Sequence, residues 1–571
     1  MFPQSARPGH RRHVPVAAAG FALMAAMVGP LVQPATAGSL PAVRRGPAAA
    51  VDSQAAAGLA TPSVAWTPCR DGFQCATVRA PLDYDDPGGD KVSLSVIRRP
   101  AAVRNERIGS LMVDPGGPGV SGVDFVRELV KYLPPVLRAR FDVVGFDPRG
   151  VRRSTPVRCF TTAAEANEVR PPFTFPVTPA EEQLQRRYLT RLGVACARHA
   201  GAILAHVSTA DAARDMDFLR GALGDQRMSY WGLSYGSMLG QTYANLFPDK
   251  VRAMVIDGVI DPRRWVGRGA AGKTVPLGAR LRSDVGAQKT LNEFFRLCDQ
   301  AGPAGCALAG SSARRYAALA ARLRAHPQEI PGGTVTYALF VSGTLGALHS
   351  SHTWPDAATF FADLEKRAKP AVLARDLAIL RSRLGLGAAA QEPYPNVLEG
   401  KPAVACSDAN NPDTFTAWTT AAARTERQHG YFGRPWTWSW SECLTWPKTA
   451  GQDRYVGPWT ARTARPVLVV GNYFDPATHY GGAVAASQLL PRSRLLTYAG
   501  WGHVAYLAGN FCVDRAVTRY LVTVRTPAAG KVCRPEGSPF GPGEAVSGSG
   551  PAALIAAATL PEAVRRALSR W

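Results

Sequence analysis

The feature that most restricts the fold of this chain is a serine flanked by glycines where a predicted strand meets a predicted helix. Residues 228–233 read as a short buried strand, GLSYG (232–236) overlaps its end, and residues 238–247 have a helical pattern. Glycines two positions before and after a serine permit a turn too tight for side chains, which lifts the serine hydroxyl above the sheet edge. The pattern predicts a nucleophile elbow at Ser234, in a sheet whose strands alternate with helices.

Apolar runs of strand length recur along the chain, and helical patterns separate most of them. Parallel strands need long crossover connections, so this alternation predicts an α/β fold with a mainly parallel sheet flanked by helices. The other predicted strands are 92–97, 108–113, 141–146, 251–256, 466–470 and 493–498.

Strand patterns are nearly absent between about residues 261 and 465. Helical patterns at 287–297, 313–323 and 357–384 take their place, and a tryptophan-rich stretch follows. The economical interpretation is a largely helical cap at 262–465, inserted between core segments 66–261 and 466–534. Alternate tryptophans at 436–440 predict a strand or loop with one aromatic face, although core packing is their commoner use. Residues 535–571 read as a linker and a C-terminal helix, which we expect to dock on the protein body.

The N-terminus has the three parts of a secretory signal peptide. Three arginines within residues 7–12 precede an apolar run at 14–32, and Ala35-Thr36-Ala37 forms a small-residue cleavage site. A retained membrane anchor is the alternative, but prolines and glycines interrupt the run. The pattern predicts a signal peptide at 1–37, a secreted protein and no stable membrane insertion after cleavage. Residues 38–65 read as a flexible segment or propeptide.

The formal charge of +23 arises from 66 Lys and Arg against 43 Asp and Glu. The cations are mostly arginines spread along the chain, and no nucleic-acid-binding motif accompanies them, so we predict no nucleic-acid partner. An arginine-rich composition explains the excess, with weak attraction to anionic cell-wall polymer as its one expected effect.

Ten cysteines, none within residues 1–37, predict disulfides in an exported chain. No CxxC motif supports a metal site. The sequence leaves the connectivity open, and shortest-loop pairing gives Cys69–Cys75, Cys159–Cys196, Cys298–Cys306, Cys406–Cys443 and Cys512–Cys533.

A serine nucleophile needs a base and an orienting acid. Asp475 and His503 each follow a predicted strand, in the chain order Ser…Asp…His. His479 is the alternative base. His349 and His352 form an HxxH pair on a predicted helix, but nothing supplies further ligands, so we predict no metal site and no cofactor.

The tetrahedral oxyanion needs hydrogen-bond donors. The glycine-rich segment 114–119 follows a strand, where a backbone N–H can act together with that of Tyr235. The residues DPRG (147–150) end the next strand and are assigned to loop structure.

Several stretches together resemble one family: DPGGPGVSG (114–122), FDPRG (146–150), GLSYGS (232–237), VIDGVIDP (255–262), CLTWP (443–447), GNYFDP (471–476) and the tail from GWGH (500–503) to Cys533. The chain resembles the secreted tripeptidyl aminopeptidases, relatives of the prolyl aminopeptidases within the α/β-hydrolases. The resemblance implies a serine exopeptidase that releases short fragments, expected to be tripeptides, from peptide N-termini through an acyl-enzyme. It implies Ser234, Asp475 and His503 as the triad, with oxyanion N–H groups from Gly117 and Tyr235.

Three residues depart from the family pattern. Asp114 stands where relatives usually carry Asn, Pro115 where the prolyl enzymes have His, and Arg152 replaces the usual second glycine after DPRG. These departures leave the triad intact and the substrate open.

An aminopeptidase must also hold a cationic substrate N-terminus, for which Asp408 and Glu442 are candidates, with ordinary surface acids as the alternative. An esterase or lipase-like hydrolase, a prolyl aminopeptidase and a binding protein with a relic triad are the competing functions.

Overall fold

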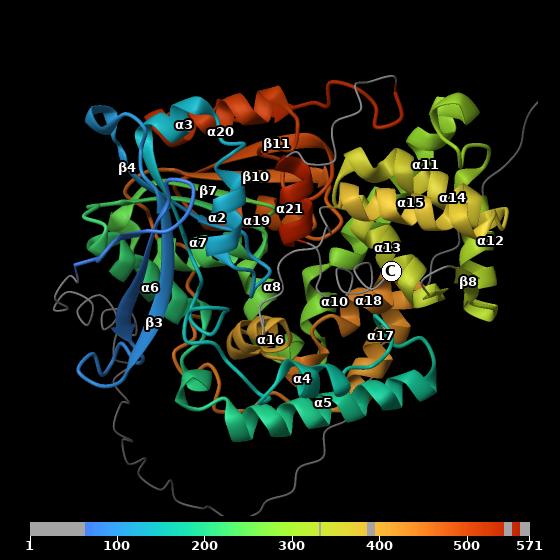
Figure 1. The fold of residues 1–571 in the computed structure, drawn as a ribbon, viewed down its shortest axis with the longest axis horizontal. Helices are drawn as coiled ribbons and strands as arrows, with labels where there is room; N and C mark the ends of the chain where they lie inside the picture. The colour runs from blue at the N-terminus through green and yellow to red at the C-terminus, as the bar shows by residue number, and fades with distance from the viewer. Residues whose placement is uncertain (1–62, 331–332, 385–393, 395, 542–550, 560–571) are drawn as a thin grey trace, which may run out of the picture. The chain divides into compact units, whose positions relative to one another are not determined.

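The computed structural model describes residues 63–330, 333–384, 394, 396–541 and 551–559, and a ten-stranded sheet organises them (Figure 1). Its order is β1-β2-β3-β5-β4-β6-β7-β10-β11-β12. Neighbours from β5 to β12 run parallel, whereas β1, β2 and β3 join antiparallel, so the predicted fold class is confirmed. The strands are β1 (Thr67–Pro68), β2 (Gln74–Pro81), β3 (Lys91–Arg99), β4 (Gly109–Asp114), β5 (Phe141–Phe146), β6 (Met228–Leu233), β7 (Val251–Asp257), β10 (Val467–Phe474), β11 (Ser493–Trp501) and β12 (Val532–Cys533).

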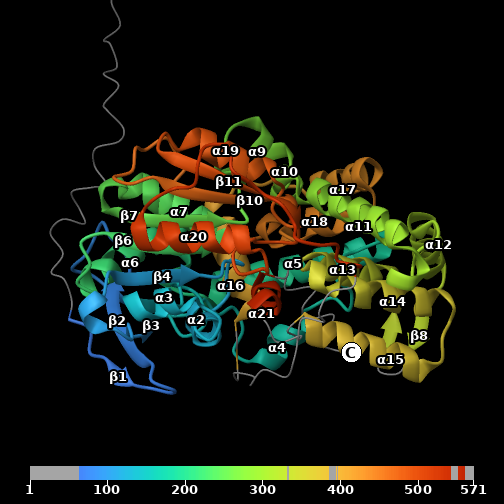
Figure 2. The ribbon, with the colours of Figure 1, turned by 90° about the horizontal axis from the view of Figure 1, so that it is seen from above.

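The central strands send alternate side chains into two separate cores, as a sheet covered on both faces requires. In β4, Met112 packs into one core, whereas Leu111 and Val113 pack into the other. Helices α6, α7 and α19 cover the first face, and α2, α3 and α20 cover the second (Figures 1 and 2). The carboxyl ends of the parallel strands therefore meet at one edge. These helices are α2 (Gly122–Leu129), α3 (Pro135–Arg140), α6 (Thr209–Ala222), α7 (Tyr235–Leu246), α19 (Gly481–Leu489) and α20 (Phe511–Thr523).

Between β7 and β10 the chain forms helices and one short hairpin, a largely helical insertion. Helices α4 (Ala163–Glu168) and α5 (Pro179–His199) come earlier, between β5 and α6. The insertion contains α8 (Pro262–Val266), α9 (Ala270–Thr274), α10 (Leu277–Leu281), α11 (Ser283–Gly305), α12 (Ser312–Ala325), β8 (Gln328–Ile330), β9 (Gly333–Val335), α13 (Tyr337–Leu348), α14 (Trp354–Glu365), α15 (Pro370–Arg383), α16 (Val397–Asp408), α17 (Phe415–His429) and α18 (Gly433–Trp438).

Two predictions within the insertion need closer description. The helical pattern at 357–384 corresponds to two helices, because α14 ends at Glu365 and Pro370 begins α15. Proline suits the first turn of a helix, so it favours a new start at this point. The tryptophans at 436–440 predict a strand or loop, yet the first two belong to α18. All three are buried, so the strand or loop is wrong and the alternative interpretation, core packing of the insertion, is confirmed.

The ten cysteines form five disulfides in the shortest-loop pattern, and none is free, which confirms the prediction of a disulfide-bonded protein. Cys406–Cys443 joins α16 to the turn η7 (Ser441–Leu444), and Cys159–Cys196 joins the loop after β5 to α5. Both bridges fix elements outside the sheet, in or beside the insertion.

The predicted C-terminal helix at 552–568 is described only as α21 (Pro551–Thr559). α21 contacts α2 and buries Ile555 and Ala556, as expected for a docked helix. The predicted signal peptide and residues 38–62 lie outside the described residues. Within the part of the chain that is described, no helix combines the length and apolar character needed to cross a bilayer.

Candidate active site

Ser234 occupies the sharp turn between β6 and α7, with φ 57° and ψ −121°. The flanking glycines are required there, because a Cβ on Gly232 would lie 2.3 Å from the carbonyl oxygen of Gly236. A Cβ on Gly236 would lie 2.7 Å from the carbonyl oxygen of Asp114. The Ser234 N–H donates to the Asp257 carbonyl at 2.8 Å, which ties the turn to the end of β7.

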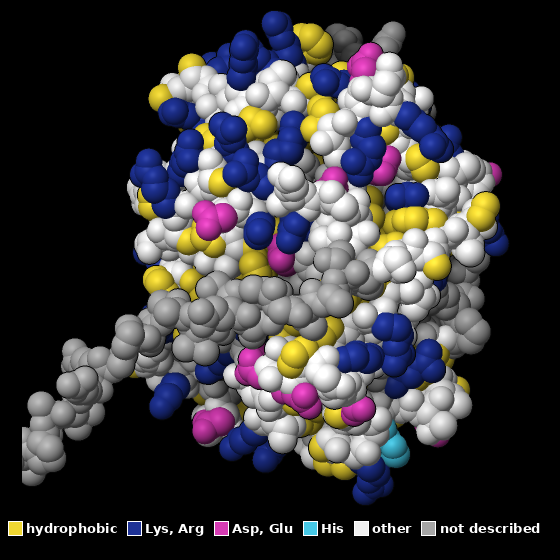
Figure 3. All heavy atoms as spheres, turned by 90° about the vertical axis from the view of Figure 1, so that its left-hand side faces the viewer, with side chains coloured by type: hydrophobic (Ala, Val, Ile, Leu, Met, Phe, Trp, Pro, Cys, Tyr) yellow, Lys and Arg dark blue, Asp and Glu magenta, His cyan; other side chains and the backbone are white. Residues whose placement is uncertain are grey.

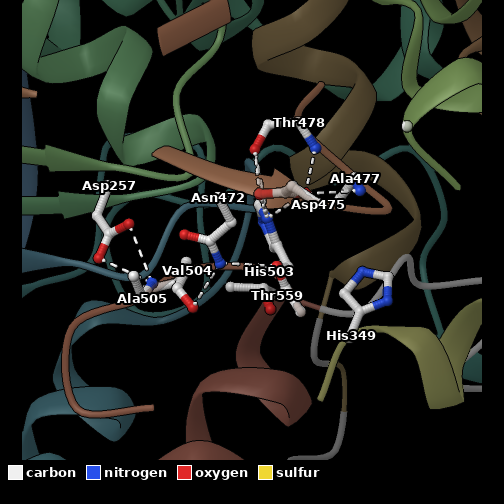
Figure 4. A network of polar contacts seen from close by, with 12 residues as sticks. Asp257, His349, Asn472, Asp475, Ala477, Thr478, His503, Val504, Ala505 and Thr559 are labelled. Atoms are coloured by element: carbon white, nitrogen blue, oxygen red, sulfur yellow. Dashed lines mark hydrogen bonds and ion pairs between the residues drawn. The ribbon is translucent and has the colours of Figure 1, made fainter. Parts of the chain in front are cut away.

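His503 and Asp475 form a buried pair beyond the ends of β11 and β10 (Figure 4). His503 Nδ1 lies 2.9 and 3.0 Å from the two Asp475 carboxylate oxygens. The carboxylate also accepts hydrogen bonds from the Ala477 N–H, the Thr478 N–H and the Thr478 hydroxyl, at 2.7–2.9 Å. These bonds fix the carboxylate and therefore the imidazole that donates to it.

The proton on Nδ1 leaves His503 Nε2 with a lone pair. Nε2 is buried and has no hydrogen-bond partner among the described residues. The turn after β7 touches both halves of the site: Asp257 accepts from Ser234, and a Cβ on Gly258 would lie 2.8 Å from His503 Cε1. No hydrogen bond joins Ser234 to His503 in the described part of the chain; such bonds are often long before substrate binds.

Two buried groups that the sequence analysis did not select lie beside the pair. Asp257 accepts from the N–H groups of Ala505 and Tyr506 at 2.9–3.1 Å, and burial raises the pKa of this carboxyl to about 7. His349 accepts the His503 N–H through its carbonyl at 2.9 Å, and the two rings lie 5.6 Å apart. Burial lowers the pKa of His349 to about 4, so this ring is neutral at pH 7.

The HxxH prediction is wrong in its geometry. His349 caps the end of α13, and His352 belongs to the separate turn η5 (Ser351–Thr353), so the two do not share a helix. The turn follows α13 directly, and the hydrophobic periodicity of the sequence alone does not reveal that the helix ends between the two histidines.

A cavity of about 260 Å³ opens over Ser234 and is lined by both the core and the insertion. Gly117, with φ 103°, lines it, and a Cβ on neighbouring Gly116 would lie 2.8 Å from the Tyr235 nitrogen. The glycine loop therefore contacts the start of α7. Thr478 and Thr559, the last described residue of α21, also line the cavity.

His479, the alternative base, lines the same cavity. Its Nδ1 accepts the Gly481 N–H at 3.1 Å. The pKa of His479 is lowered by burial first and then by Arg282, Lys289 and Arg264. The Asp475 carboxylate is hydrogen-bonded to His503 and not to His479, so His503 is the base that has an orienting acid.

The two candidate amine-binding acids occupy different surroundings. Asp408 is buried at the end of α16 and accepts from the Thr209 N–H and the Trp265 indole, each at 2.8 Å. Burial raises its pKa to about 6, and it does not line the Ser234 cavity. Glu442 lines a neighbouring cavity that shares Lys401, Trp436 and Ser439 with the first. Its buried Oε2 has no hydrogen-bond partner among the described residues.

The DPRG loop is held by its arginine. Buried Arg149 forms a two-point ion pair with Asp215 at 2.6 and 2.7 Å and donates to the carbonyls of Pro81, Leu82 and His206. Arg149 thus joins β2 to α6, behind the loop that carries Arg152.

The fold and the site together define a class: this protein is a serine hydrolase of the α/β-hydrolase fold. Residues 110–273 match the family model described as alpha/beta hydrolase fold, and residues 429–533 match the one described as TAP-like protein.

Whole-chain similarity gives the family. The chain is 32% identical to the tripeptidyl aminopeptidase of Streptomyces lividans over 504 residues, 85% of this chain and 89% of the relative. It is 32% identical to serine protease Hip1 of Mycobacterium tuberculosis (strain ATCC 25618 / H37Rv) over 510 residues, 82% and 91% of the two chains. Carboxylesterase B of the same strain is 34% identical over 498 residues, 84% and 91%. The chain belongs to the tripeptidyl aminopeptidase family and is a serine peptidase.

Proposed function

We propose that this protein is an exported serine exopeptidase that releases short fragments, principally tripeptides, from peptides with a free N-terminus. The observation that carries the proposal is the buried His503–Asp475 pair, 2.9 Å apart, which contacts Thr478 in the wall of the Ser234 cavity. The tripeptidyl aminopeptidase of Streptomyces lividans, similar over most of this chain, supports a three-residue fragment.

The catalytic cycle is acyl transfer. Ser234 Oγ attacks the scissile carbonyl carbon while His503 Nε2 accepts the hydroxyl proton, and Asp475 stabilises the resulting imidazolium. The N–H groups of Gly117 and Tyr235 donate to the oxyanion. His503 then protonates the leaving amine, which breaks the C–N bond and leaves an ester on Ser234. Water, deprotonated by His503, hydrolyses that ester and restores the serine.

Glu442 is the group we assign to the substrate amine. It lies in the cavity adjoining that of Ser234, and its buried Oε2 lacks a partner among the described residues, so an ammonium group there gains a charge-assisted hydrogen bond. Asp408 is the weaker candidate, because Thr209 and Trp265 already satisfy it.

Five disulfides support export, since such bonds persist in oxidising compartments. Protein recovered from the culture medium should begin at or after residue 38, as determined by N-terminal sequencing. Full-length protein retained in the cytoplasm contradicts export.

An esterase is the second candidate. Carboxylesterase B is as similar to this chain as the peptidases are, and most charged side chains lining the Ser234 cavity are cationic, which does not favour an ammonium group there.

Three substrates separate these functions: a tripeptide p-nitroanilide with a free amine, its N-acetyl form and a short p-nitrophenyl ester. We expect the free peptide to be cleaved at least tenfold faster than the blocked one, with the tripeptide as product. Equal cleavage of both peptides contradicts an aminopeptidase. Turnover of the ester alone favours the esterase, and no turnover favours a binding protein. When the free tripeptide begins with proline, release of that single residue favours a prolyl aminopeptidase.

A further inference from the structure

The cavity over Ser234 has an unbalanced set of charges. Lys and Arg side chains are also spread over the face of the molecule that Figure 3 shows, so a number of cations around the cavity is not by itself evidence of a binding site. The evidence is the position and the contacts of each cation. Its lining contains five cationic side chains and one carboxylate, whereas the whole chain has 66 cationic and 43 acidic residues. The six are Arg152, Arg263, Arg264, Arg282, Lys401 and Asp261.

The single carboxylate is already shared by two of the cations. Asp261 Oδ2 lies 3.2 Å from Arg263 Nη2 and 3.6 Å from Arg264 Nε. Asp261 also caps α8 by accepting the Arg263 N–H. One carboxylate cannot neutralise two guanidinium groups, so this corner of the cavity keeps a net positive charge. The two arginine side chains are 56% and 47% exposed, and both line the cavity.

Two further cations face the cavity from other parts of the insertion. Arg282, between α10 and α11, is exposed and forms no ion pair among the described residues. Burial first, and then the charge of Arg282, lowers the pKa of His479, which lines the same cavity. Lys401 lies with Nζ 4.2 Å from the Trp440 ring centre and donates to the Ser439 carbonyl. The cavity wall therefore holds positive charge contributed by three separate segments of the insertion, at α8, before α11 and on α16.

Arg152 adds a cation at an unfavourable backbone position. Its φ is 49°, in the left-handed region that glycine adopts without cost and other residues rarely occupy. The Asn396 side chain accepts the Arg152 N–H at 2.9 Å and holds the loop in place. A glycine would relieve the backbone there, yet the chain carries a long cationic side chain that lines the catalytic cavity.

We propose that this cavity selects substrates that carry a carboxylate close to the scissile bond. Arginine guanidinium groups bind carboxylates through two parallel hydrogen bonds, and a cleft lined by charges of one sign focuses their field on an oppositely charged ligand. The carboxylate comes either from an Asp or Glu side chain or from the C-terminus of a short peptide. This inference rests on the proposed peptidase function and specifies its substrate class.

Two sets of peptides distinguish the carboxylate sources. In the first, each position of Ala-Ala-Ala-p-nitroanilide is replaced in turn by Glu, Gln or Lys. In the second, Ala-Ala-Ala-Ala with a free C-terminus is compared with its C-terminal amide. We expect kcat/KM to be about tenfold higher for Glu than for Gln, or for the free C-terminus than for its amide, which corresponds to roughly 1.4 kcal/mol. A preference for Glu over Gln identifies a side chain, and a preference for the free C-terminus identifies the peptide end.

Salt and variants test the cause of the preference. Raising NaCl from about 50 to about 500 mM should reduce the preference several-fold, because ions screen exposed charges. Arg282→Gln and Arg152→Gly should each reduce it at least threefold. Glycine adopts a positive φ freely, so Arg152→Gly is expected to fold, which circular dichroism checks. Arg519→Gln, an exposed arginine on α20, is the matched control and should leave the preference unchanged.

The outcomes keep the two proposals separate. Cleavage of neutral peptides without any preference for a carboxylate overturns the inference and leaves the peptidase intact. If no peptide is cleaved, the peptidase proposal fails. The selection is then tested on p-nitrophenyl hemisuccinate against p-nitrophenyl butyrate, where faster hydrolysis of the neutral ester overturns it.

Discussion

Asp475 decides which nitrogen of His503 carries the proton. Its carboxylate accepts from Nδ1 and from three donors of residues 477 and 478, so it can only accept, and Nε2 remains the acceptor for the serine. An asparagine presents an N–H₂ group in place of one oxygen and favours the opposite tautomer of the ring.

Asp475→Asn should therefore lower kcat by about 10³–10⁴-fold on a chromogenic peptide. Thr478→Val is the matched control, because it removes one hydroxyl bond to the carboxylate and keeps the charge; about a tenfold loss is expected. A similar small loss for both variants would show that Asp475 does not set the tautomer.

Asp114, unlike Asp475, lies in an environment that favours the protonated carboxyl group. Its buried carboxyl accepts one N–H, from Gly116 at 2.8 Å, and burial raises its pKa to about 7. The folded state thus keeps a proton that the unfolded chain releases near pH 4. Stability from this group is complete below about pH 4 and is lost as the pH rises through about 7.

Asp114→Asn removes this titration and keeps the acceptor for Gly116. Relative to the parent protein, the variant should gain about 3 kcal/mol in the free energy of unfolding between pH 5 and pH 8. Urea unfolding with intact disulfides measures both proteins at the two pH values. An identical pH dependence contradicts the raised pKa.

At the scale of the elements, the Cys406–Cys443 bridge ties α16 to the turn after the buried tryptophans. Lys401 on α16 and Trp436 on α18 both line the cavity, so this bridge holds two of its walls together.

Replacing Cys406 and Cys443 by alanine should lower the free energy of unfolding by about 4 kcal/mol, since the loop spans 37 residues. The same change at Cys69 and Cys75, six residues apart, should cost about 2 kcal/mol and leave KM unchanged. Removal of the longer bridge, Cys406–Cys443, should also raise KM. Equal effects of the two double variants on KM would mean that the bridge does not shape the cavity.

Local patterns predicted most of the sheet. The strands at 141–146 and 228–233 match β5 and β6 because both are buried on two faces and read as continuous apolar runs. β2 was missed: its run QCATVRAP is partly exposed, and pairing with β3 stabilises it rather than local propensity. The break between α14 and α15 was missed because the apolar period continues across it.

Some residues of the site, like some strands of the sheet, can be predicted from local sequence patterns and others cannot. Ser234, Asp475 and His503 could be selected because each follows a strand of a parallel sheet. Asp257 and His349 could not, because their roles depend on the end of β7 and the end of α13 meeting the loop that follows β11, contacts between residues far apart in the chain. The cation-rich cavity likewise depends on α8, α11 and α16 meeting over one serine.

In the molecule as a whole, a mainly parallel sheet and a helical insertion bring one reactive serine to the base of an accessible cavity. A fluorophosphonate reagent that forms a covalent bond with activated serines tests this directly, with the labelled residue identified by mass spectrometry of proteolytic fragments. We expect stoichiometric labelling of Ser234 in the parent protein and at least a hundredfold slower labelling in folded His503→Ala. Absence of labelling in the folded parent protein, or labelling of a different serine, contradicts this expectation.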